Sequence, residues 1–300
     1  MTKTIDCVVL TDQRYILNSS SETYIQNVLD EDAFVVNALK AEGLNAIRLA
    51  WDNAHFNWET TKCIIFRTTW DYFDRFTAFS KWLSQVSKKT TLINSEAIIR
   101  WNIDKHYLQD LKKNKIHTAE TYFIEKGSGI SLKQLHKNLQ WKDTVLKPCV
   151  SGAARHTYKL TPDNLEAHEA VFKDLIKFEA MMLQPFQYNI VDKGELSLMV
   201  FNGQFTHAVL KKAKAGDFRV QDDFGGSVFD YQPTNEEIIF AEQAVKACKE
   251  LPLYARVDIF EDNHGHIALS ELELIEPELW FRKYPKAANI LAKAIKTKLS

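Results

Sequence analysis

Short apolar runs and longer stretches of helical periodicity alternate through the first third of the chain. Strands are predicted at residues 5–10, 45–49 and 63–66, and helices at 24–42 and 76–86. Gly43 directly follows the first of these helices and provides a C-terminal stop. Because strands that alternate with helices favour a parallel sheet covered on both faces, we expect residues 1–97 to form an N-terminal α/β domain.

The pattern changes in the second segment, residues 98–187. Strands are predicted there at 121–124, 145–147 and 181–186, and helices at 104–114 and 162–178. Thr161 has the side chain of a good N-cap, and Pro162 suits the first position of the second helix. A compact unit of this kind favours an α+β lid over a doubly wound sheet.

The last segment, residues 188–300, is the richest in strands. Apolar or alternating runs predict strands at 195–201, 204–210, 254–260 and 266–274, and helical spacing predicts helices at 235–250 and 285–299. Because no internal repeat or low-complexity linker separates the three segments, we expect them to pack closely. The predicted fold class is α/β with an α+β lid.

Composition limits the kinds of partner. Among 300 residues, 38 Lys+Arg stand against 39 Asp+Glu, which is not the basic excess of a protein that binds nucleic acid. No stretch approaches the ~18 apolar residues of a membrane helix, and the N-terminus turns polar too early for a signal peptide. We therefore expect a cytoplasmic protein without a nucleic-acid or membrane partner.

The cysteines are far apart in the sequence and form no CxxC pair. They are Cys7, Cys63, Cys149 and Cys248. This spacing does not predict a zinc cluster or a disulfide framework. We expect reduced and mostly buried thiols.

Carboxylates recur with strand periodicity near the end of the chain. Glu271 and Glu273 lie two residues apart in a predicted strand and therefore share a face, and Asp258 lies in the preceding strand of a predicted hairpin. Clustered carboxylates repel one another unless a cation lies between them, and hard oxygen ligands suit magnesium. Spacing alone favours the alternative, a strand with one solvent-facing side.

Two groups of basic residues lie near small-residue or glycine turns. Lys147 ends an apolar strand before the loop 149–155, where Ser151 and backbone amides would support a phosphate. Lys211 and Arg219 precede the glycine pair at 225–226. The alternative for each is an ordinary solvated turn, and this alternative is stronger for Lys105 at a helix start. The loop is not a Walker A motif, because GxxxxGK[ST] is absent.

Taken in order along the chain, these features resemble the ATP-grasp superfamily over residues 98–280. The resemblance implies an ATP-grasp fold with a Rossmann-like pre-ATP-grasp domain at 1–97, a central part with the lid subdomain at 98–187, and a C-terminal domain with the metal site at 188–300. It also implies nucleotide contacts from the two lysines, the strand that reads adenine, a ribose-binding acid and a phosphate-facing cation. These residues are Lys105, Lys147, Gln184, Pro185, Phe186, Glu195 and Lys211.

The same resemblance assigns the catalytic and metal-binding residues. Lys147 and Arg219 match the catalytic cations of the superfamily, and Asp258, Glu271 and Glu273 match its magnesium ligands, with Pro277 following as in the family pattern. Glu273 stands where relatives usually have asparagine. The implied cofactors are ATP and Mg²⁺ or Mn²⁺.

Within the superfamily the chain is most similar to glutathione synthetase-like ligases, and among these to the cyclo-ligases of cycloserine biosynthesis that close O-ureido-serine into a ring. The segments RTTWDY, GDFRVQDDFGG and ELELIEP carry this narrower resemblance. The loop 149–155 has one glycine where many relatives have several. The resemblance also implies a homodimer or homotetramer.

Such ligases work in two steps, which the named residues would serve. A carboxylate attacks the γ-phosphate of ATP, and an amine then attacks the acyl phosphate and releases phosphate. Phosphoryl transfer depends mainly on positioning and charge neutralisation. A lid is expected to keep water from the acyl phosphate, and the loop 149–155 is our candidate.

The acid and amine substrates are expected at the end of a strand of the first domain. Arg67, Trp70, Asp71 and Tyr72 lie there, and an arginine with an aspartate suits the two charges of an amino acid or a small peptide. The equal alternative is that the aromatic residues are core or interface side chains. Ser151 and Arg155 are further candidate substrate contacts.

Three functions remain open on the sequence. A carboxylate–amine ligase leads, and a cyclo-ligase or peptide-modifying ligase would keep the nucleotide site with a different product. A nucleotide-binding scaffold without turnover is the non-enzymatic alternative, although it leaves the complete set of carboxylates and cations unexplained. His207 is predicted to be a partly buried structural histidine, with a catalytic role as the alternative.

Overall fold

The first domain is built on a sheet of parallel strands. The computed structural model describes residues 3–17, 20–152, 154–214, 216–220 and 225–300. Within them the strand order of the first sheet is β2-β1-β3-β4, and every pairing is parallel. The strands are β1 (Ile5–Thr11), β2 (Ala46–Ala50), β3 (Thr61–Thr68) and β4 (Thr91–Ile93), and short 3₁₀ turns lie at Gln13–Tyr15 and Trp58–Thr60.

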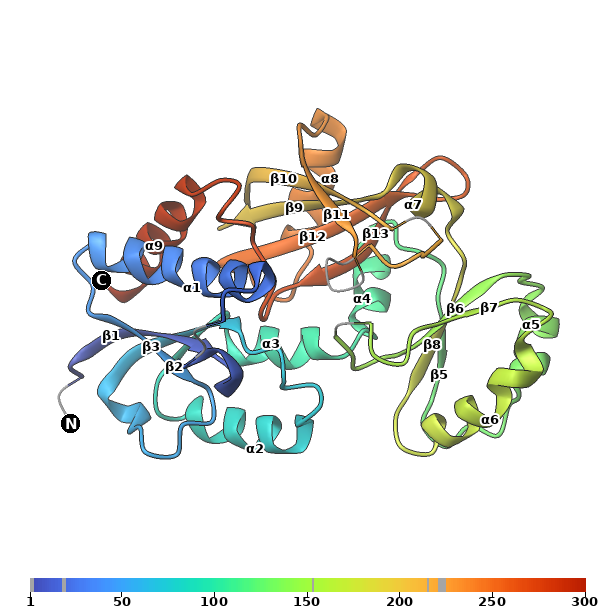
Figure 1. Ribbon diagram of the computed structural model, residues 1–300, viewed down its shortest axis with the longest axis horizontal. Coiled ribbons are helices and arrows are strands. Elements are labelled where there is room, and N and C mark those ends of the chain that lie inside the picture. The colour runs from blue at the N-terminus through green and yellow to red at the C-terminus, as the bar shows by residue number, and fades with distance from the viewer. Residues whose placement is uncertain (1–2, 18–19, 153, 215, 221–224) are drawn as a thin grey trace.

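Helices cover both faces of this sheet, as the alternating pattern predicts (Figure 1). Val9 and Ile65 pack with α1 (Thr23–Ala41), whereas their neighbours Val8 and Ile64 pack with α2 (Phe76–Val86) and α3 (Glu96–Ile103). This division follows from the strand, in which successive side chains point to opposite faces. The parallel sheet buried on two sides is therefore confirmed.

The lid contains a separate antiparallel sheet, which lies away from the first domain in Figure 1. The order is β5-β8-β6-β7. The elements are β5 (Tyr122–Ile124), α5 (Leu132–Leu139), β6 (Thr144–Pro148), β7 (Tyr158–Leu160), α6 (Leu165–Ile176) and β8 (Met181–Pro185). Leu135 and Phe172 on the two helices share a buried cluster with Leu146 and Leu183 on the strands, so the helices cover one face of the sheet.

The third sheet has five antiparallel strands in the order β11-β10-β9-β12-β13. The elements of this part are α4 (Tyr107–Lys113), α7 (Tyr188–Lys193), β9 (Glu195–Phe201), β10 (Gln204–Lys212), β11 (Ser227–Tyr231), α8 (Asn235–Lys246), β12 (Tyr254–Glu261) and β13 (Ile267–Glu273). Ala244 and Val245 of α8 pack against Leu198, Val200 and Val257, which makes one face of the sheet apolar. The opposite face is free to carry polar groups.

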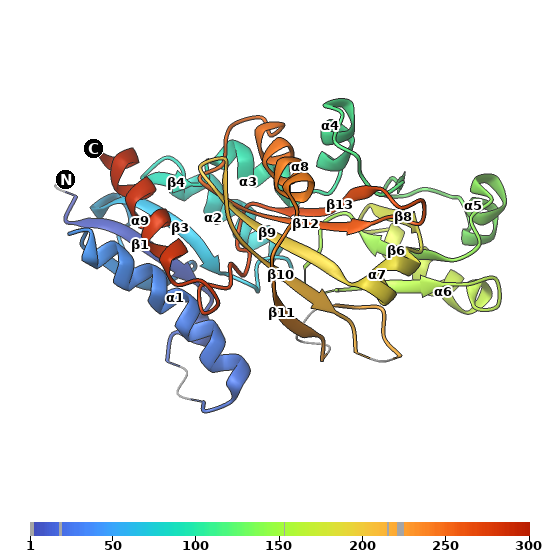
Figure 2. The same cartoon turned by 90° about the horizontal axis from the view of Figure 1, so that it is seen from above.

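The end of the chain returns to the first domain. Helix α9 (Lys286–Leu299) packs beside α1, as both views show (Figures 1 and 2). The same buried cluster contains Phe201 and Tyr254 from the third sheet. The strands of the three sheets lie within residues 1–97, 98–187 and 188–300 respectively, and this cluster joins the first of these ranges to the last.

Two predicted helix starts are wrong. The helix expected from Pro162 begins at Leu165, because the Thr161 amide donates to the Asn164 side chain at 2.8 Å and closes a turn before the helix. The helix expected from Asp104 begins at Tyr107, because Asp104 is extended and ends α3. Its carboxylate then accepts the His106 amide at 3.0 Å and starts a new turn. No helix in the described part of the chain is long and apolar enough to cross a membrane.

His207 on β10 is a buried structural residue. Its Nε2 lies 2.9 Å from the Leu279 carbonyl oxygen, and its ring stacks on Tyr284 with centroids 5.1 Å apart. Burial lowers the His207 pKa to about 4, although the carbonyl acceptor acts in the opposite direction. The side chain lines neither of the two cavities described below.

We expect His207→Gln to change how stability depends on pH. The pKa of His207 in the unfolded chain is about 6.5. Between pH 6.5 and 4 the unfolded chain therefore binds a proton at this residue, whereas the native state does not. The wild type should lose about 2 kcal/mol from this residue between pH 6.5 and 5, and the variant should not. Urea unfolding at both pH values measures this, with His55→Gln on an exposed loop as the control. An equal loss in wild type and His207→Gln would contradict the assignment.

Candidate active site

Two cavities meet over the polar face of the third sheet. The lid cavity, of about 220 Å³, lies between the lid strands and this sheet. The N-terminal cavity, of about 310 Å³, lies between the first domain and this sheet. The residues that line both are Lys105, Ser151, Gly152, Lys211, Arg256, Glu271 and Glu273. Charged groups therefore form a common wall between two spaces.

Strand register brings these charges together. Asp258 in β12 lies opposite Glu271 in β13, and Arg256 lies opposite Glu273. On the other side of β12, Asp258 faces Ser197 of β9, while Glu195 of β9 faces Lys211 of β10. Because cross-strand partners point to the same face, residues far apart in sequence become neighbours on one surface.

Asp258 is enclosed by donors. The Lys211 ammonium lies 3.1 Å from its carboxylate, the Arg256 guanidinium 2.9 Å away, and the Ser197 hydroxyl donates at 2.5 Å. Burial opposes the charge on Asp258, but Arg256 and Lys211 outweigh burial and lower its pKa to about 2. Lys211 also pairs with Glu195 at 2.6 Å. Asp258 is thus held ionised at the base of the site.

The glutamates of β13 differ from each other. Burial works against the charge of Glu271, but Lys105 at 2.8 Å and Lys147 lower its pKa. Glu273 pairs with Arg256, yet burial, Asp258 and Glu271 raise its pKa to about 7. Negative charge is therefore incompletely balanced on the side of Glu273.

A hard divalent cation fits this imbalance. Asp258, Glu271 and Glu273 offer carboxylate oxygens from two adjacent strands, which is the ligand type that Mg²⁺ prefers. A cation there would relieve the repulsion that raises the Glu273 pKa. The donor type thus suits the predicted metal, but the described residues do not bring these three carboxylates within 4.8 Å of one another, so they would have to move closer to hold one ion.

The two lysines reach the same wall from different elements. Lys105, at the turn between α3 and α4, is 6% exposed and donates to the Ser151 carbonyl at 2.9 Å. Its charge is disfavoured by burial but favoured by Glu271, and its pKa is raised. Lys147 on β6 lines the lid cavity, and burial together with the repulsion of Lys105 lowers its pKa.

The rest of the lid cavity is lined by apolar and polar side chains together. Its predicted adenine-reading residues Gln184, Pro185 and Phe186 lie at the end of β8, and the Phe186 ring meets Phe218 with centroids 5.9 Å apart. Arg219 also lines the cavity and pairs with Asp217 at 2.7 Å. The apolar members of the lining are Ala119, Val145, Ala154, Pro185, Phe186, Ile190, Val191, Phe218, Val220 and Phe260. Such a lining suits a flat, partly apolar ring beside a charged wall.

Known proteins share both the sequence and the architecture. Residues 7–94 match the family described as the N-terminal domain of D-cycloserine synthetase DcsG. The cycloserine biosynthesis protein DcsG of Streptomyces lavendulae is 26% identical over 259 residues, which cover 82% of this chain and 86% of that protein. The crystal structure of D-cycloserine synthetase DcsG matches 98% of this chain and 99% of its own, with a TM-score of 0.85 and 23% identity.

More distant structures have the same architecture. The ATP-grasp ligase PsnB, complexed with a phosphomimetic variant of its minimal precursor, Mg and ADP, covers 99% of both chains with a TM-score of 0.65 and 14% identity. D-alanine–D-alanine ligase from Bacillus anthracis, complexed with ATP, covers 98% of this chain and 97% of its own, with a TM-score of 0.64 and 15% identity.

The chain has the ATP-grasp fold. The resemblance and the fold class predicted from the sequence are confirmed, and the chain is similar to ligases of this class, as that resemblance implies. The lid cavity is lined by residues of the lid strands and of the third sheet, and Figure 1 shows these two sheets beside each other.

The ATP-grasp fold brings only some of the predicted substrate residues to a cavity. Trp70 and Tyr72 line the N-terminal cavity. Arg67 does not, because it is 1% exposed, donates to the Pro277 carbonyl at 2.7 Å and packs against apolar rings. Asp71 accepts from the Trp51 indole at 2.7 Å and pairs with Arg75.

The loop 149–155 contains two predicted substrate contacts, of which one lines the cavities and the other does not. Ser151 lines both cavities, whereas Arg155 lines neither and pairs with Glu179. Gly152 lies so close to Phe73 that a Cβ there would fall 2.6 Å from the ring. The loop is thus packed against the first domain across the junction of the cavities. Residue 153 of this loop, and residues 221–224 of the segment GDFRVQDDFGG, lie outside the described residues.

Sequence reasoning missed several residues of the site. Arg256 precedes Asp258 by two positions on one strand, so the spacing that selected Glu271 and Glu273 applied to it as well. Glu276 lines the N-terminal cavity, where burial and the charge of Glu273 raise its pKa to about 8. Glu276 lies beyond the end of β13, so the strand periodicity that selected Glu271 and Glu273 does not apply to it.

The charge imbalance at Glu273 can be tested directly. Because its folded pKa lies above the unfolded value of about 4.5, ionised Glu273 lowers stability above pH 7, and this cost disappears as the pH falls to 4.5. We expect Glu273→Gln to raise the free energy of unfolding of the metal-free protein at pH 8 by about 1–3 kcal/mol, and by much less at pH 5. Added Mg²⁺ should stabilise the variant less than the wild type.

Urea unfolding with and without Mg²⁺ at both pH values measures these differences. Glu120→Gln, on an exposed loop of the same charge type, is the control. A variant that is less stable than the wild type at pH 8 without metal would show that Arg256 fully compensates Glu273.

Proposed function

We propose that the protein is an ATP- and Mg²⁺-dependent ligase that joins a carboxylate to an amine through an acyl phosphate. The observation that supports this most strongly is the charged wall shared by two cavities. One cavity includes apolar side chains such as Phe186 and Phe218 that suit a nucleotide base, and the other is lined by residues of the first domain. A phosphoryl group leaving a nucleotide in the first would meet an acceptor in the second.

Residues of the wall and of the adjoining lid cavity divide the work of the first step. Lys105 and Lys147 bind phosphate oxygens, and Arg219 neutralises charge at the mouth of the lid cavity. Asp258, Glu271 and Glu273 hold Mg²⁺, which supplies positive charge to the polyphosphate when bound. The substrate carboxylate oxygen forms a bond to the γ-phosphorus, and the bond from phosphorus to ADP breaks.

The second step uses the other side of the wall. The amine nitrogen attacks the acyl carbon, phosphate leaves and the nitrogen loses a proton. Arg256 lines both cavities, so its guanidinium is placed to stabilise negative charge on the acyl oxygen. The loop at Ser151 and Gly152 covers the junction and limits the access of water to the acyl phosphate.

The N-terminal cavity suits an amino acid or a short peptide. It combines cationic side chains with acidic ones, so both charged groups of an amino acid find partners. Its ionisable lining away from the shared wall consists of Arg14, Tyr15, Tyr24, Tyr72, Asp74, Glu276, Glu278 and Arg282. At about 310 Å³ the cavity holds a small substrate more readily than a long one.

Ring closure is the second candidate. The relative that matches 82% of this chain is a cycloserine biosynthesis protein, and a small cavity that accepts both ends of one molecule suits an intramolecular reaction. ADP release from a single substrate that carries both acid and amine, with a product lighter by one water, would favour it. A requirement for a separate amine would favour intermolecular ligation.

Nucleotide binding is expected to stabilise the fold. ATP with Mg²⁺ at ~100 times its dissociation constant should add roughly 2.7 kcal/mol, which means a rise of several degrees in the unfolding midpoint. Thermal unfolding with ATP, Mg²⁺, both or neither measures this. A large shift that requires both is expected, and no shift at millimolar nucleotide would overturn the nucleotide site.

Substitutions in the wall or the adjoining lid cavity should stop turnover without unfolding the protein. Lys147→Ala removes a phosphate contact and Glu271→Ala removes a metal ligand, and each should lower ADP release by at least about 100-fold. Coupled measurement of ADP during a screen of amino acids and dipeptides tests this. Lys142→Ala, exposed on the same lid, is the matched control. Near-normal turnover in either site variant would refute the assignment, and binding of ATP without turnover on any substrate would favour the scaffold.

A further inference from the structure

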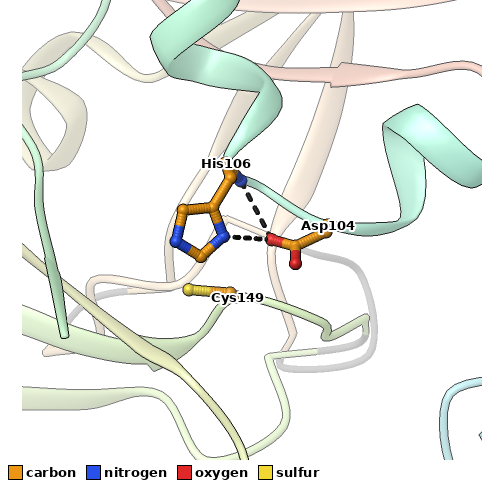
Figure 3. A group of neighbouring side chains, drawn as sticks. All are labelled: Asp104, His106 and Cys149. Atoms are coloured by element: carbon orange, nitrogen blue, oxygen red, sulfur yellow. Dashed lines mark hydrogen bonds and ion pairs between the residues drawn. The ribbon is translucent and has the colours of Figure 1, made fainter. Parts of the chain in front are cut away.

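Three side chains with metal-binding atoms lie close together, at positions near Lys105 and Lys147 in the sequence. They are Asp104, His106 and Cys149, and their ligand atoms all lie within 4.8 Å of one another. Figure 3 shows the Cys149 sulfur beside the imidazole ring and the Asp104 carboxylate at its Nδ1 edge. None of the three lines the lid cavity or the N-terminal cavity, so this group is separate from the carboxylates of the charged wall.

The backbone holds the three residues in place. The Lys105 amide donates to the Cys149 carbonyl at 2.9 Å, and the Cys149 amide donates to the Ala180 carbonyl at 2.9 Å. The His106 amide donates to Asp104 Oδ1 at 3.0 Å. Cys149 is 1% exposed and is a free cysteine. A buried thiol thus faces an imidazole and a carboxylate.

The imidazole is oriented from its other side. His106 Nδ1 lies 2.5 Å from Asp104 Oδ1, whereas Nε2 lies 3.3 Å from Glu125 Oε1. The ring stacks on Phe123 with centroids 4.3 Å apart. Nδ1 is thus the nitrogen that would bind an ion together with Asp104, and Glu125 lies at the other nitrogen, Nε2. A carboxylate in the position of Glu125 is the usual companion of a metal-bound histidine, because it fixes the tautomer and raises the basicity of the ligand.

We propose that Asp104, His106 and Cys149 bind one thiophilic divalent cation of the Zn²⁺ type. Thiolate, imidazole and carboxylate together suit zinc, whereas Mg²⁺ does not use sulfur. The thiol proton passes to solvent when the sulfur binds the ion. Asp104 and His106 are half-buried, which gives the ion a route from solvent and a fourth position for water. No signal in the sequence marks this group, since Cys149 lies far along the chain from Asp104 and His106 and belongs to no CxxC pair.

A plain hydrogen-bonded turn explains only part of the arrangement. It accounts for Asp104, which receives the His106 amide, but it assigns nothing to the Cys149 sulfur. A second mixed group, His117, Asp262 and His266, is less organised. Both of its imidazoles are exposed, and His266 Nδ1 lies 3.9 Å from Asp262. It therefore serves as a comparison.

The position of the site gives the ion a structural effect. Asp104 and His106 flank Lys105, and Cys149 follows Lys147 by two residues at the end of β6. A bound ion would tie the α3–α4 turn to a strand of the lid, and so fix the two lysines relative to each other. The proposal does not rest on the ligase function, since it concerns binding alone.

Cobalt provides the test, because thiolate bound to Co²⁺ absorbs in the near ultraviolet whereas oxygen ligands do not. We expect chelator-treated, reduced full-length protein to gain this band with one equivalent of Co²⁺ in excess Mg²⁺, and to lose it when Zn²⁺ is added. Cys149→Ser should abolish the band. Glu125→Gln should weaken Co²⁺ binding by about 10–100-fold while leaving the band at saturation.

Two controls separate this site from others. Cys248→Ser and His266→Ala, which remove the half-buried cysteine and a member of the comparison group, should leave the band and the stoichiometry unchanged. Circular dichroism checks the fold of Cys149→Ser, and His106→Gln at a half-buried position provides a second test if that variant unfolds. No band in the wild type, or a band that persists in folded Cys149→Ser or in His106→Gln with unchanged affinity, overturns the proposal.

Discussion

Asp258 lies 2% exposed in the centre of an antiparallel sheet, and its charge persists there only because Lys211, Arg256 and Ser197 surround it. Burying a carboxylate costs several kcal/mol unless such partners are present. The two cations also have a second acidic partner each: Lys211 pairs with Glu195, and Arg256 pairs with Glu273. This balanced network sets the polar face of the third sheet, and both cavities exist because the other layers meet that face without covering it.

The two cavities thus combine opposite requirements on one surface. Toward the lid, apolar side chains and a charged wall accommodate a molecule that has a flat ring and several negative charges. Toward the first domain, acids and bases are mixed, which suits a small zwitterion. In the mechanism proposed above, reactivity at the boundary would follow from geometry, because groups such as Arg256 and Lys105 line both spaces. That mechanism needs no covalent chemistry from the protein.

Periodicity predicted the long elements and the charged strands well, because burial on one face leaves a regular signal in the sequence. It failed for short or interrupted ones: β4 and β7 have three residues each, and α3 runs into α4 with only the turn at Asp104 between them. For the site, spacing placed Glu271 and Glu273 on one face but could not show which arginine reaches the surface. Arg67 and Arg256 both lie on strands beside acids or aromatics, and only tertiary packing buries the first and exposes the second to the cavities.

The packing of α9 on α1 has a consequence for how the chain is made. The first domain contains its whole parallel sheet within about a hundred residues, yet one face of that sheet is completed by the last helix of the chain. During synthesis the N-terminal strands emerge first, but their apolar face stays without its final cover until α9 has left the ribosome. Domain order in the sequence is therefore not the order of completion, and a nascent chain that stalls before residue 286 would expose the core of the domain that it began with.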